Sequence, residues 1–306
     1  MRIGVTGARG FVGRWLEAEL VASGHEVIGV DQPELDVCDP DRVGAWLRET
    51  APDAVAHLAG VAFGPDARAD PATAFAVNVG GTTSLMNAAA TLTRPPVVLV
   101  SGSADVYAPP VAARALTEDD ATGPVAPYGV SKLAQEKAAI AAAASRGLAV
   151  VVTRSFNHTG PGQRPVFVVP AMAGRVAAVA DGTTDVVTVG NLDVRRDFMD
   201  VRDVVIAYRL LLEALGDGRL PTGGLIQNVA SGRAIAIRDI VTDLCAIAGV
   251  DPAIVVDPAL VRSGEPGYIV GDRSRLERTT GWQPRIPWHQ TLRDVYADVA
   301  ATRQAG

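Results

Sequence analysis

The first half of the chain alternates short apolar runs with longer stretches of helical periodicity. Runs rich in β-branched residues predict strands over residues 2–6, 27–31, 54–58, 97–101 and 149–154. Between the first two runs, apolar side chains recur at helical spacing from Phe11 to Val21, and Gly24 ends the pattern. Strands that alternate with helices are typical of βαβ units. We therefore expect an α/β fold built on a doubly wound parallel sheet.

The second half predicts a smaller lobe. Further helices are expected over 71–91, from Pro127 to about Ala144, and over 203–215, 237–248 and 292–301. The alternation breaks at the segment 160–170, which is rich in glycine and proline, and a strand near 225–230 would rejoin the main sheet. We expect residues 1–160, joined by 197–230, to form the first domain. Residues 161–196 and 231–306 would form a smaller α/β C-terminal lobe that binds the substrate.

Composition and charge limit the classes of function. The 306 residues are 48% apolar and 20% charged, which suits a chain with a large core and argues against disorder. With no apolar run of about 18 residues and no leader-like segment before the first strand, we expect a cytoplasmic protein without membrane contact. The net charge of −6 argues against nucleic acid as a partner. The two cysteines and four histidines show no ligand spacing, so no metal is expected.

Three glycines, Gly7, Gly10 and Gly13, separate the first strand from the first helix. Glycines there permit a tight turn and let a pyrophosphate reach the amide groups of the helix N-terminus. In this context the spacing indicates a Rossmann-type dinucleotide site rather than a purely structural turn. Asp31 ends the second strand, where a carboxylate can accept hydrogen bonds from the adenosine ribose. That favours NAD(H), although Arg9 in the loop leaves NADP(H) possible.

Tyr128 and Lys132 are spaced four residues apart near the start of a helix, so both project from one face. A neighbouring ammonium favours the phenolate and should lower the pKa of Tyr128 towards the range useful for proton transfer. Ser103 lies just beyond the strand 97–101, at the edge of the sheet where ligand crevices form. A Tyr-x-x-x-Lys pair alone is common on helix surfaces. Together with the glycine loop it indicates a catalytic site.

With these motifs the chain resembles the extended short-chain dehydrogenase/reductase family over essentially its whole length. Besides the glycine loop and Asp31, the resemblance is carried by His57-Leu58-Ala59-Gly60, by residues 78–82, and by Ser103, Pro127-Tyr128 and Ser131-Lys132. It implies a catalytic triad of Ser103, Tyr128 and Lys132, with Lys132 also binding the nicotinamide ribose. The residue patterns and the resemblance together place cofactor contacts at Gly7, Arg9, Gly10, Phe11, Val12, Gly13, Asp31, Asp36, Val37, Leu58, Ala59, Gly60, Asn78, Tyr128 and Lys132. Of these, Asp36 could equally be an ordinary loop residue.

The second half narrows the branch of the family. Residues 154–163 and 190–198 look like the GDP-mannose 4,6-dehydratase and GDP-4-keto-6-deoxymannose reductase branch, and 197–204 is closer to the reductase. By that resemblance Asn157 and Arg196 would contact a sugar nucleotide, and Arg262 with Glu265 would reach its phosphate and ribose. Arginine forks suit a diphosphate. The expected substrate contacts are Ser103, Asp105, Asn157, Val168, Arg196, Arg262 and Glu265.

Four functions stay open at this point, namely reductase, dehydratase, 4-epimerase and dinucleotide-binding regulator. Dehydratases of the family carry a glutamate where this chain has Asp105, whose arm is one methylene shorter, so dehydration is disfavoured. A 4-epimerase would use the same triad as a reductase. A dinucleotide-binding regulator without catalysis would not need Ser103, Tyr128 and Lys132. Relatives present serines where this chain has Val61–Pro65, which leaves the hexose open. We expect an NAD(P)H-dependent, homodimeric reductase that acts on a GDP-linked 4-keto-6-deoxy sugar nucleotide.

Overall fold

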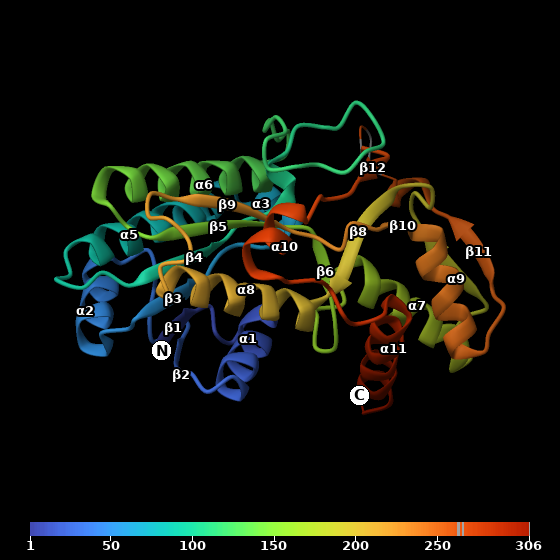
Figure 1. The fold of residues 1–306 in the computed structure, drawn as a ribbon. Coiled ribbons are helices and arrows are strands. Elements are labelled where there is room, and N and C mark those ends of the chain that lie inside the picture. The colour runs from blue at the N-terminus through green and yellow to red at the C-terminus, as the bar shows by residue number, and fades with distance from the viewer. Residues whose placement is uncertain (262–263, 265, 306) are drawn as a thin grey trace.

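One large parallel sheet forms the centre of the molecule (Figure 1). The computed structural model describes residues 1–261, 264 and 266–305. Strand order reverses between the first and third strands, as in a doubly wound sheet, and all neighbouring strands are parallel. Across the sheet the strands are β2 (Glu26–Val30), β1 (Arg2–Thr6), β3 (Ala54–His57), β4 (Val97–Ser101), β5 (Val150–Ser155) and β9 (Leu225–Val229).

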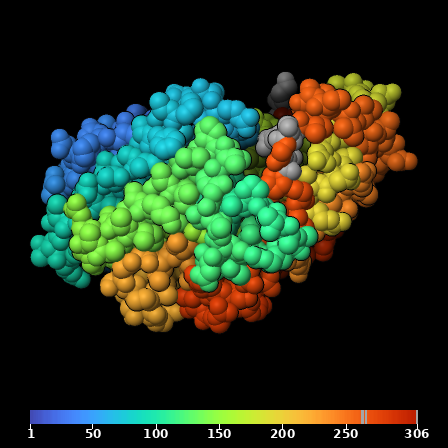
Figure 2. Space-filling view, turned by 90° about the horizontal axis from the view of Figure 1, so that it is seen from above, coloured from blue at the N-terminus to red at the C-terminus, as the bar shows by residue number. Residues whose placement is uncertain are grey.

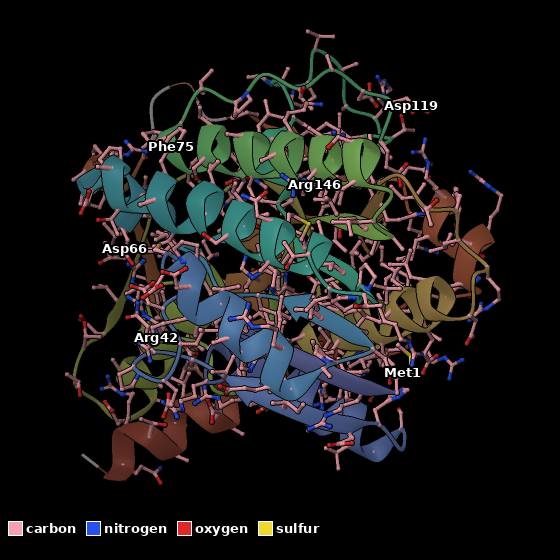
Figure 3. The ribbon with its side chains drawn as sticks, turned by 90° about the vertical axis from the view of Figure 1, so that its left-hand side faces the viewer. Met1, Arg42, Asp66, Phe75, Asp119 and Arg146 are labelled. Carbon is pink, nitrogen blue, oxygen red and sulfur yellow. The ribbon has the colours of Figure 1, made fainter. Side chains whose placement is uncertain are left out.

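Helices cover both faces of this sheet. Apolar positions of the helices, such as Leu16, Leu47 and Leu211, are fully buried against it. One face carries α1 (Phe11–Ala22) and α8 (Val201–Gly216), which pack on each other. On the other face α2 (Pro40–Thr50), α5 (Thr82–Ala90) and α6 (Pro127–Arg146) lie side by side (Figure 3). Helix α2 begins at Pro40, directly after the capping residue Asp39, and was not among the predicted helices.

The predicted helix over residues 71–91 is interrupted. The structure divides it into α4 (Pro71–Phe75), a π-helical turn η1 (Ala76–Gly81) and α5. A π-turn is a local widening that often occurs at functional sites. Here its fully buried polar residue is Asn78, whose amide is bonded to the backbone of Val61. Helical periodicity cannot predict such a contact, because the partner, Val61, lies on another segment.

Smaller sheets and their helices form the carboxyl-terminal part. Its core includes Val176, Leu244 and Leu292, which are buried between α7 (Val168–Ala180), α9 (Ile237–Ala248) and α11 (Trp288–Ala305). Short elements complete the fold, namely α3 (Gly64–Ala69), η2 (Ala104–Val106), η3 (Pro258–Leu260) and α10 (Ser274–Thr280). One sheet has the order β10 (Ala234–Ala236), β8 (Arg195–Asp200), β12 (Tyr268–Ile269), with β6 (Asn157–Thr159) also on β8, and the other pairs β7 (Val186–Val189) with β11 (Ala253–Val256). The predicted α/β fold class is confirmed, whereas the domain boundaries remain a prediction.

A long connection between η2 and α6 joins the two parts. In Figure 2 its green surface lies against the orange surface of the carboxyl-terminal residues. Leu116 forms a parallel β-bridge with Gly271, and its amide donates to the carbonyl oxygen of Val270 over 2.8 Å. No helix in the described ranges is long and apolar enough to cross a membrane.

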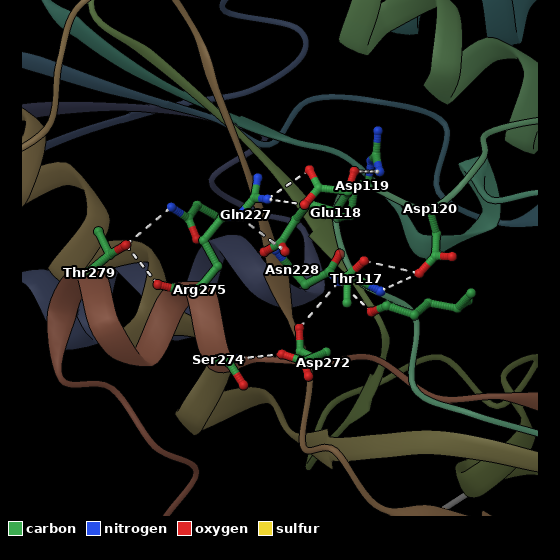
Figure 4. Close-up of polar contacts among 12 residues, drawn as sticks. Thr117, Glu118, Asp119, Asp120, Gln227, Asn228, Asp272, Ser274, Arg275 and Thr279 are labelled. Carbon is green, nitrogen blue, oxygen red and sulfur yellow. Dashed lines mark hydrogen bonds and ion pairs between the residues drawn. The ribbon is translucent and has the colours of Figure 1, made fainter.

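Buried ion pairs fix this connection and helix α6 to the sheet. Arg154 on β5 is bonded through two nitrogens to the carboxylate of Glu136 on α6, each over 2.8 Å, and both side chains are almost fully buried. Glu118, in the connection, accepts from the backbone amide of Asn228 over 2.8 Å and faces Arg275 of α10 at 3.3 Å (Figure 4). These contacts tie α6 and α10 to neighbouring strands of the main sheet.

The buried ion pair between Arg154 and Glu136 should therefore contribute to the free energy of unfolding. Replacing Arg154→Gln removes both guanidinium bonds from the buried Glu136 carboxylate and leaves it the ammonium of Lys137, at 3.6 Å on a mostly exposed side chain, so the change is expected to cost about 3 kcal/mol of unfolding free energy. Urea unfolding at neutral pH measures the change. The control is Arg238→Gln, because Arg238 forms an exposed pair with Asp193, and such pairs contribute about 1 kcal/mol or less. Equal losses in both variants would contradict the role given to burial.

Candidate functional site

The glycine turn between β1 and α1 is closed by direct backbone packing. Gly7 has φ +73°, and a Cβ there would lie 2.7 Å from the backbone nitrogen of Ala59. A Cβ on Gly13 would lie 2.3 Å from the carbonyl oxygen of Gly7. The N-cap residue of α1 is Gly10, which offers no side-chain cap, and the first turn, which begins with Phe11 and Val12, contains no acidic residue. The first amides of the helix are thus suited to an anion such as a pyrophosphate.

Asp31 follows β2 and faces this turn. One carboxylate oxygen accepts from the backbone amide of Arg9 over 3.1 Å, and the other accepts from Gln32 over 2.8 Å. The guanidinium of Arg9 donates to the carbonyl oxygen of Gln32 over 3.1 Å and forms an ion pair with Glu34. The guanidinium of Arg9, which could compensate the charge of the 2′-phosphate of NADP(H), is therefore already paired with Glu34.

The other predicted cofactor residues gather at the same edge of the sheet. Gly60 lies beside Asn78 and Lys132, since a Cβ on it would be 2.8 Å from the Asn78 side-chain oxygen and 3.4 Å from the Lys132 nitrogen. Leu58 is half-buried between β3 and this loop. Asp36 accepts from the amide of Cys38 over 2.9 Å, so its carboxylate stabilises its own turn. Val37 is buried, and its side chain lies close against the backbone of Gly81.

Asn78 joins this loop to the helix that carries the tyrosine. Its side-chain oxygen accepts from the amide of Val61 over 2.9 Å, and its nitrogen donates to the hydroxyl of Ser131 over 2.9 Å. The Ser131 hydroxyl in turn donates to the carbonyl oxygen of Tyr128 over 2.8 Å. The position of loop 59–61 is thus coupled to the first turn of α6.

Ser103, Tyr128 and Lys132 come together at the carboxyl ends of β4 and β5. The buried hydroxyl of Ser103 accepts from the amide of Asp105 over 3.1 Å and is hydrogen bonded to the Tyr128 phenol. Lys132 is 5% exposed, and its nitrogen donates to the carbonyl oxygen of Ser101 and to the side-chain oxygen of Gln135, each over 3.0 Å. Burial lowers the pKa of Lys132 to about 8.

The protonation of Tyr128 differs from the sequence expectation. Desolvation raises the pKa of its phenol above the ordinary value, and the negative charge of Asp105 raises it further, while the bond from Ser103 lowers it. The expected lowering by Lys132 does not dominate. In this structure Tyr128 is therefore a phenol at neutral pH and can act as a proton donor.

The predicted substrate contacts lie on separate elements. Asp105 is exposed in η2, two residues after Ser103. Asn157 is the exposed first residue of β6 and is in register with Phe198 of β8, two positions from the half-buried Arg196. Val168 is 40% exposed at the start of α7. Arg262 and Glu265 lie outside the described residues.

Four buried polar residues near Lys132 were not among the predicted site residues, namely Thr6, His57, Thr82 and Gln135. The ring of His57 is within hydrogen-bond distance of the hydroxyls of Thr6, at 2.8 Å, and Thr82, at 3.1 Å. Gln135 donates to the Thr82 hydroxyl over 2.9 Å. Burial, and then the charge of Lys132, lowers the pKa of His57 to about 3, so the ring is neutral. The available signal was position, since Gln135 follows Lys132 by three residues on one helix face.

Within residues 1–261, 264 and 266–305, no group of three histidine, cysteine, aspartate or glutamate side chains could hold a metal ion. The glycine turn, Asp31 and Lys132 instead fit a dinucleotide, since they offer helix amides, a hydroxyl acceptor and a buried cation.

Comparison with known proteins identifies the family. The model of the "NAD dependent epimerase/dehydratase family" matches residues 3–224. The GDP-6-deoxy-D-mannose reductase of Pseudomonas aeruginosa is 39% identical over 300 residues, covering 97% of this chain and 96% of the relative. The structure of RMD from P. aeruginosa complexed with NADPH has a TM-score of 0.88 and 37% identity, covering 98% of this chain and 99% of the other. The Thermus thermophilus UDP-glucose 4-epimerase complexed with NAD has a TM-score of 0.84 and 27% identity, covering 98% and 99%. As the motifs predicted, the chain belongs to the NAD-dependent epimerase/dehydratase family.

Proposed function

We propose that this chain reduces a 4-keto-6-deoxy sugar nucleotide, GDP-linked, with NAD(P)H as the electron donor. The observation that carries the proposal is the cluster of Ser103, Tyr128 and Lys132 beside the glycine turn. Its phenol is protonated at neutral pH, which suits the reduction of a carbonyl. The similarity to a GDP-6-deoxy-D-mannose reductase supports the choice of substrate class.

The residues around the turn would bind the dinucleotide. The amides at the start of α1 would hold the pyrophosphate, Asp31 the adenosine ribose and Lys132 the nicotinamide ribose. When bound, the reduced nicotinamide supplies the two electrons and the hydrogen that the carbonyl carbon gains. Asn78 holds loop 59–61 through its two hydrogen bonds to the backbone of Val61.

Proton transfer falls to Tyr128. Its phenol would donate a proton to the carbonyl oxygen as that oxygen becomes an alkoxide, and the Ser103 hydroxyl would hold the same oxygen. The ammonium of Lys132 then stabilises the phenolate that remains. Asp105, which raises the pKa of the phenol, favours the protonated starting state.

Substrate recognition would come from the smaller sheet. Asn157 and Arg196 on the paired strands β6 and β8 would contact the sugar nucleotide, with Val168 at the start of α7. Arg262 and Glu265 would complete the phosphate and ribose contacts. The segment 61–65 lacks the hydroxyls that would read a fully hydroxylated hexose.

A 4-epimerase is the second candidate, because the similarity extends to an NAD-bound UDP-glucose 4-epimerase. An epimerase returns its cofactor to the starting oxidation state, so it would interconvert sugars without net consumption of nicotinamide. A reductase consumes one equivalent of reduced nicotinamide for each product molecule.

We also propose that the chain forms a homodimer. Light scattering measures the molar mass of the assembly in solution and tests this.

Activity is tested with GDP-4-keto-6-deoxymannose and NADH or NADPH. Nicotinamide absorbance should fall in proportion to product. Tyr128→Phe is expected to lower kcat by about a hundredfold to ten-thousandfold, because the proton donor is lost, while the dissociation constant of the cofactor stays unchanged. Tyr296→Phe on α11 is the control and should retain full activity. No cofactor oxidation with any keto-sugar nucleotide would refute the reductase.

Cofactor binding is tested at the glycine turn. Gly13→Ala places a methyl group against the carbonyl oxygens of Gly7 and Ala8 and should weaken dinucleotide binding by about tenfold or more, the equivalent of about 1.4 kcal/mol. Calorimetric titration measures the dissociation constant. Gly80→Ala is the matched control, because a Cβ there meets nothing within 4 Å. Equal binding by both variants would remove the turn from the cofactor site.

We propose NAD(H) as the preferred cofactor, because Asp31 and Glu34 both lie beside Arg9. Glu34→Gln removes one negative charge and releases the guanidinium of Arg9, so NADPH binding should tighten by about tenfold relative to NADH. Glu49→Gln is the control, because it also removes one negative charge, at the exposed end of α2. If Glu34→Gln changed the affinities for NADH and NADPH equally, Arg9 would not discriminate between them. Tighter NADPH than NADH binding in the unmodified protein would refute the stated preference, and the NADPH-bound relative makes that comparison necessary.

A further inference from the structure

The ammonium of Lys132 is buried without a counter-ion. In the part of the chain that the structure describes, its nitrogen donates to two neutral oxygens, on Ser101 and Gln135, and forms no ion pair. A buried cation is usually paired with a carboxylate, because isolation costs free energy. Burial accordingly lowers the pKa of Lys132 to about 8.

The nearby charged groups are engaged elsewhere. Glu136, the neighbour of Gln135 on α6, is held by Arg154 over 2.8 Å. Asp105, from η2, acts on Tyr128. His57, from β3, is neutral, and its depressed pKa reflects the positive charge of Lys132 after burial. Tyr128 itself lies one turn before Lys132 on the same helix. The positive charge of Lys132 is therefore not cancelled by these neighbours.

The orientation of Gln135 is fixed by Thr82. The Thr82 hydroxyl donates to the carbonyl oxygen of Asn78 over 2.8 Å, so its own oxygen accepts from the Gln135 nitrogen over 2.9 Å. It also accepts from the ring of His57, whose other nitrogen accepts from the hydroxyl of Thr6 over 2.8 Å. The amide oxygen of Gln135 is left to face Lys132, and rotating the amide would set two donors against each other.

We propose that Gln135 is a positioning residue that holds the Lys132 ammonium with a neutral acceptor and keeps its charge available to Tyr128 and the bound dinucleotide. A carboxylate at this position would pair with the ammonium at close range and cancel most of its field a few ångströms away. A neutral amide fixes the same geometry and leaves the charge in place. The inference rests on the proposed function for its catalytic meaning, but its geometry does not.

The chain offers an unusual means of testing this, because it contains only two lysines, Lys132 and Lys137. Lysine labelled with ¹³C at Cε gives two signals, and Lys137→Arg assigns them. The pH titration of the Lys132 signal reports its pKa directly, with and without cofactor and without any substrate. Lys137, with a mostly exposed side chain, is the internal reference.

Two near-isosteric variants should move the Lys132 pKa in opposite directions. Gln135→Glu supplies a carboxylate and should raise it by about one unit or more, whereas Gln135→Met removes the acceptor and should lower it. Gln283→Glu, exposed and outside α6, adds the same charge elsewhere and should leave it unchanged. If Gln135→Met does not fold, Thr82→Val, which frees the Gln135 amide, should lower the pKa by a smaller amount.

The pH profile of reduction gives the catalytic readout. Because Lys132 must keep its charge to stabilise the phenolate, kcat/KM should fall as pH rises through the Lys132 pKa of about 8, and Gln135→Glu should move this limb to higher pH by raising that pKa. A Lys132 pKa that stays within about 0.3 unit in both Gln135 variants, or moves in one direction in both, would overturn the proposal. If the lysine titrations behave as expected but no keto-sugar nucleotide is reduced, the proposed function fails and the positioning role stands.

Discussion

A single buried carboxylate, that of Asp197, joins the large sheet to the smaller one. It accepts hydrogen bonds from the amide and the hydroxyl of Ser231, which follows β9, over 2.8 and 2.6 Å. It also accepts from the amides of Gly232, over 2.9 Å, and Gly271, over 3.2 Å. Burial raises the pKa of Asp197 to about 6, against the effect of these four donors, which favour the ionised form. Three segments that run between the large sheet and the smaller one, at β8, at residues 231–232 and at Gly271, therefore meet at the carboxylate of Asp197.

The candidate substrate site depends on this junction. Arg196 is the residue before Asp197 on β8, so the register that buries the carboxylate also sets the position of the arginine beside β6. Gly271 is required at the junction, because a Cβ there would lie 2.4 Å from the ring of Phe156. Close backbone packing around Asp197 thus holds Asn157 and Arg196 in a fixed relation to the main sheet.

Helix α6, which carries Tyr128 and Lys132, is anchored by separate contacts. Arg154 joins β5 to α6 through Glu136, and its guanidinium also lies 4.7 Å above the ring of Tyr107. The hydroxyl of Tyr107 donates to Asn228 on β9 over 2.6 Å. These bonds fix α6 four residues beyond Lys132, so the positions of Tyr128 and Lys132 follow from packing well outside the site itself.

The sequence predicts the parts of this architecture that depend on local patterns. Strands β1 and β4 have the predicted limits, and helix α9 spans the predicted residues, because apolar periodicity is a property of one segment. The π-turn at Asn78 and the Arg9 to Glu34 ion pair were not predicted, because each depends on contacts between segments. The same is true of the Gln135 bonds, whose partner Thr82 lies 53 positions away.

The pKa of Tyr128 shows why spacing alone misjudged the chemistry. The distance of four residues from Lys132 predicts an attractive ammonium, yet desolvation and Asp105 have the larger effect and keep the phenol protonated. A protonated phenol can donate to a carbonyl oxygen, whereas oxidation of a sugar hydroxyl, the first step of epimerisation, needs a base. In the proposed reduction Lys132 would stabilise the phenolate that this donation leaves, and its ammonium, bonded to two neutral oxygens, is suited to that role.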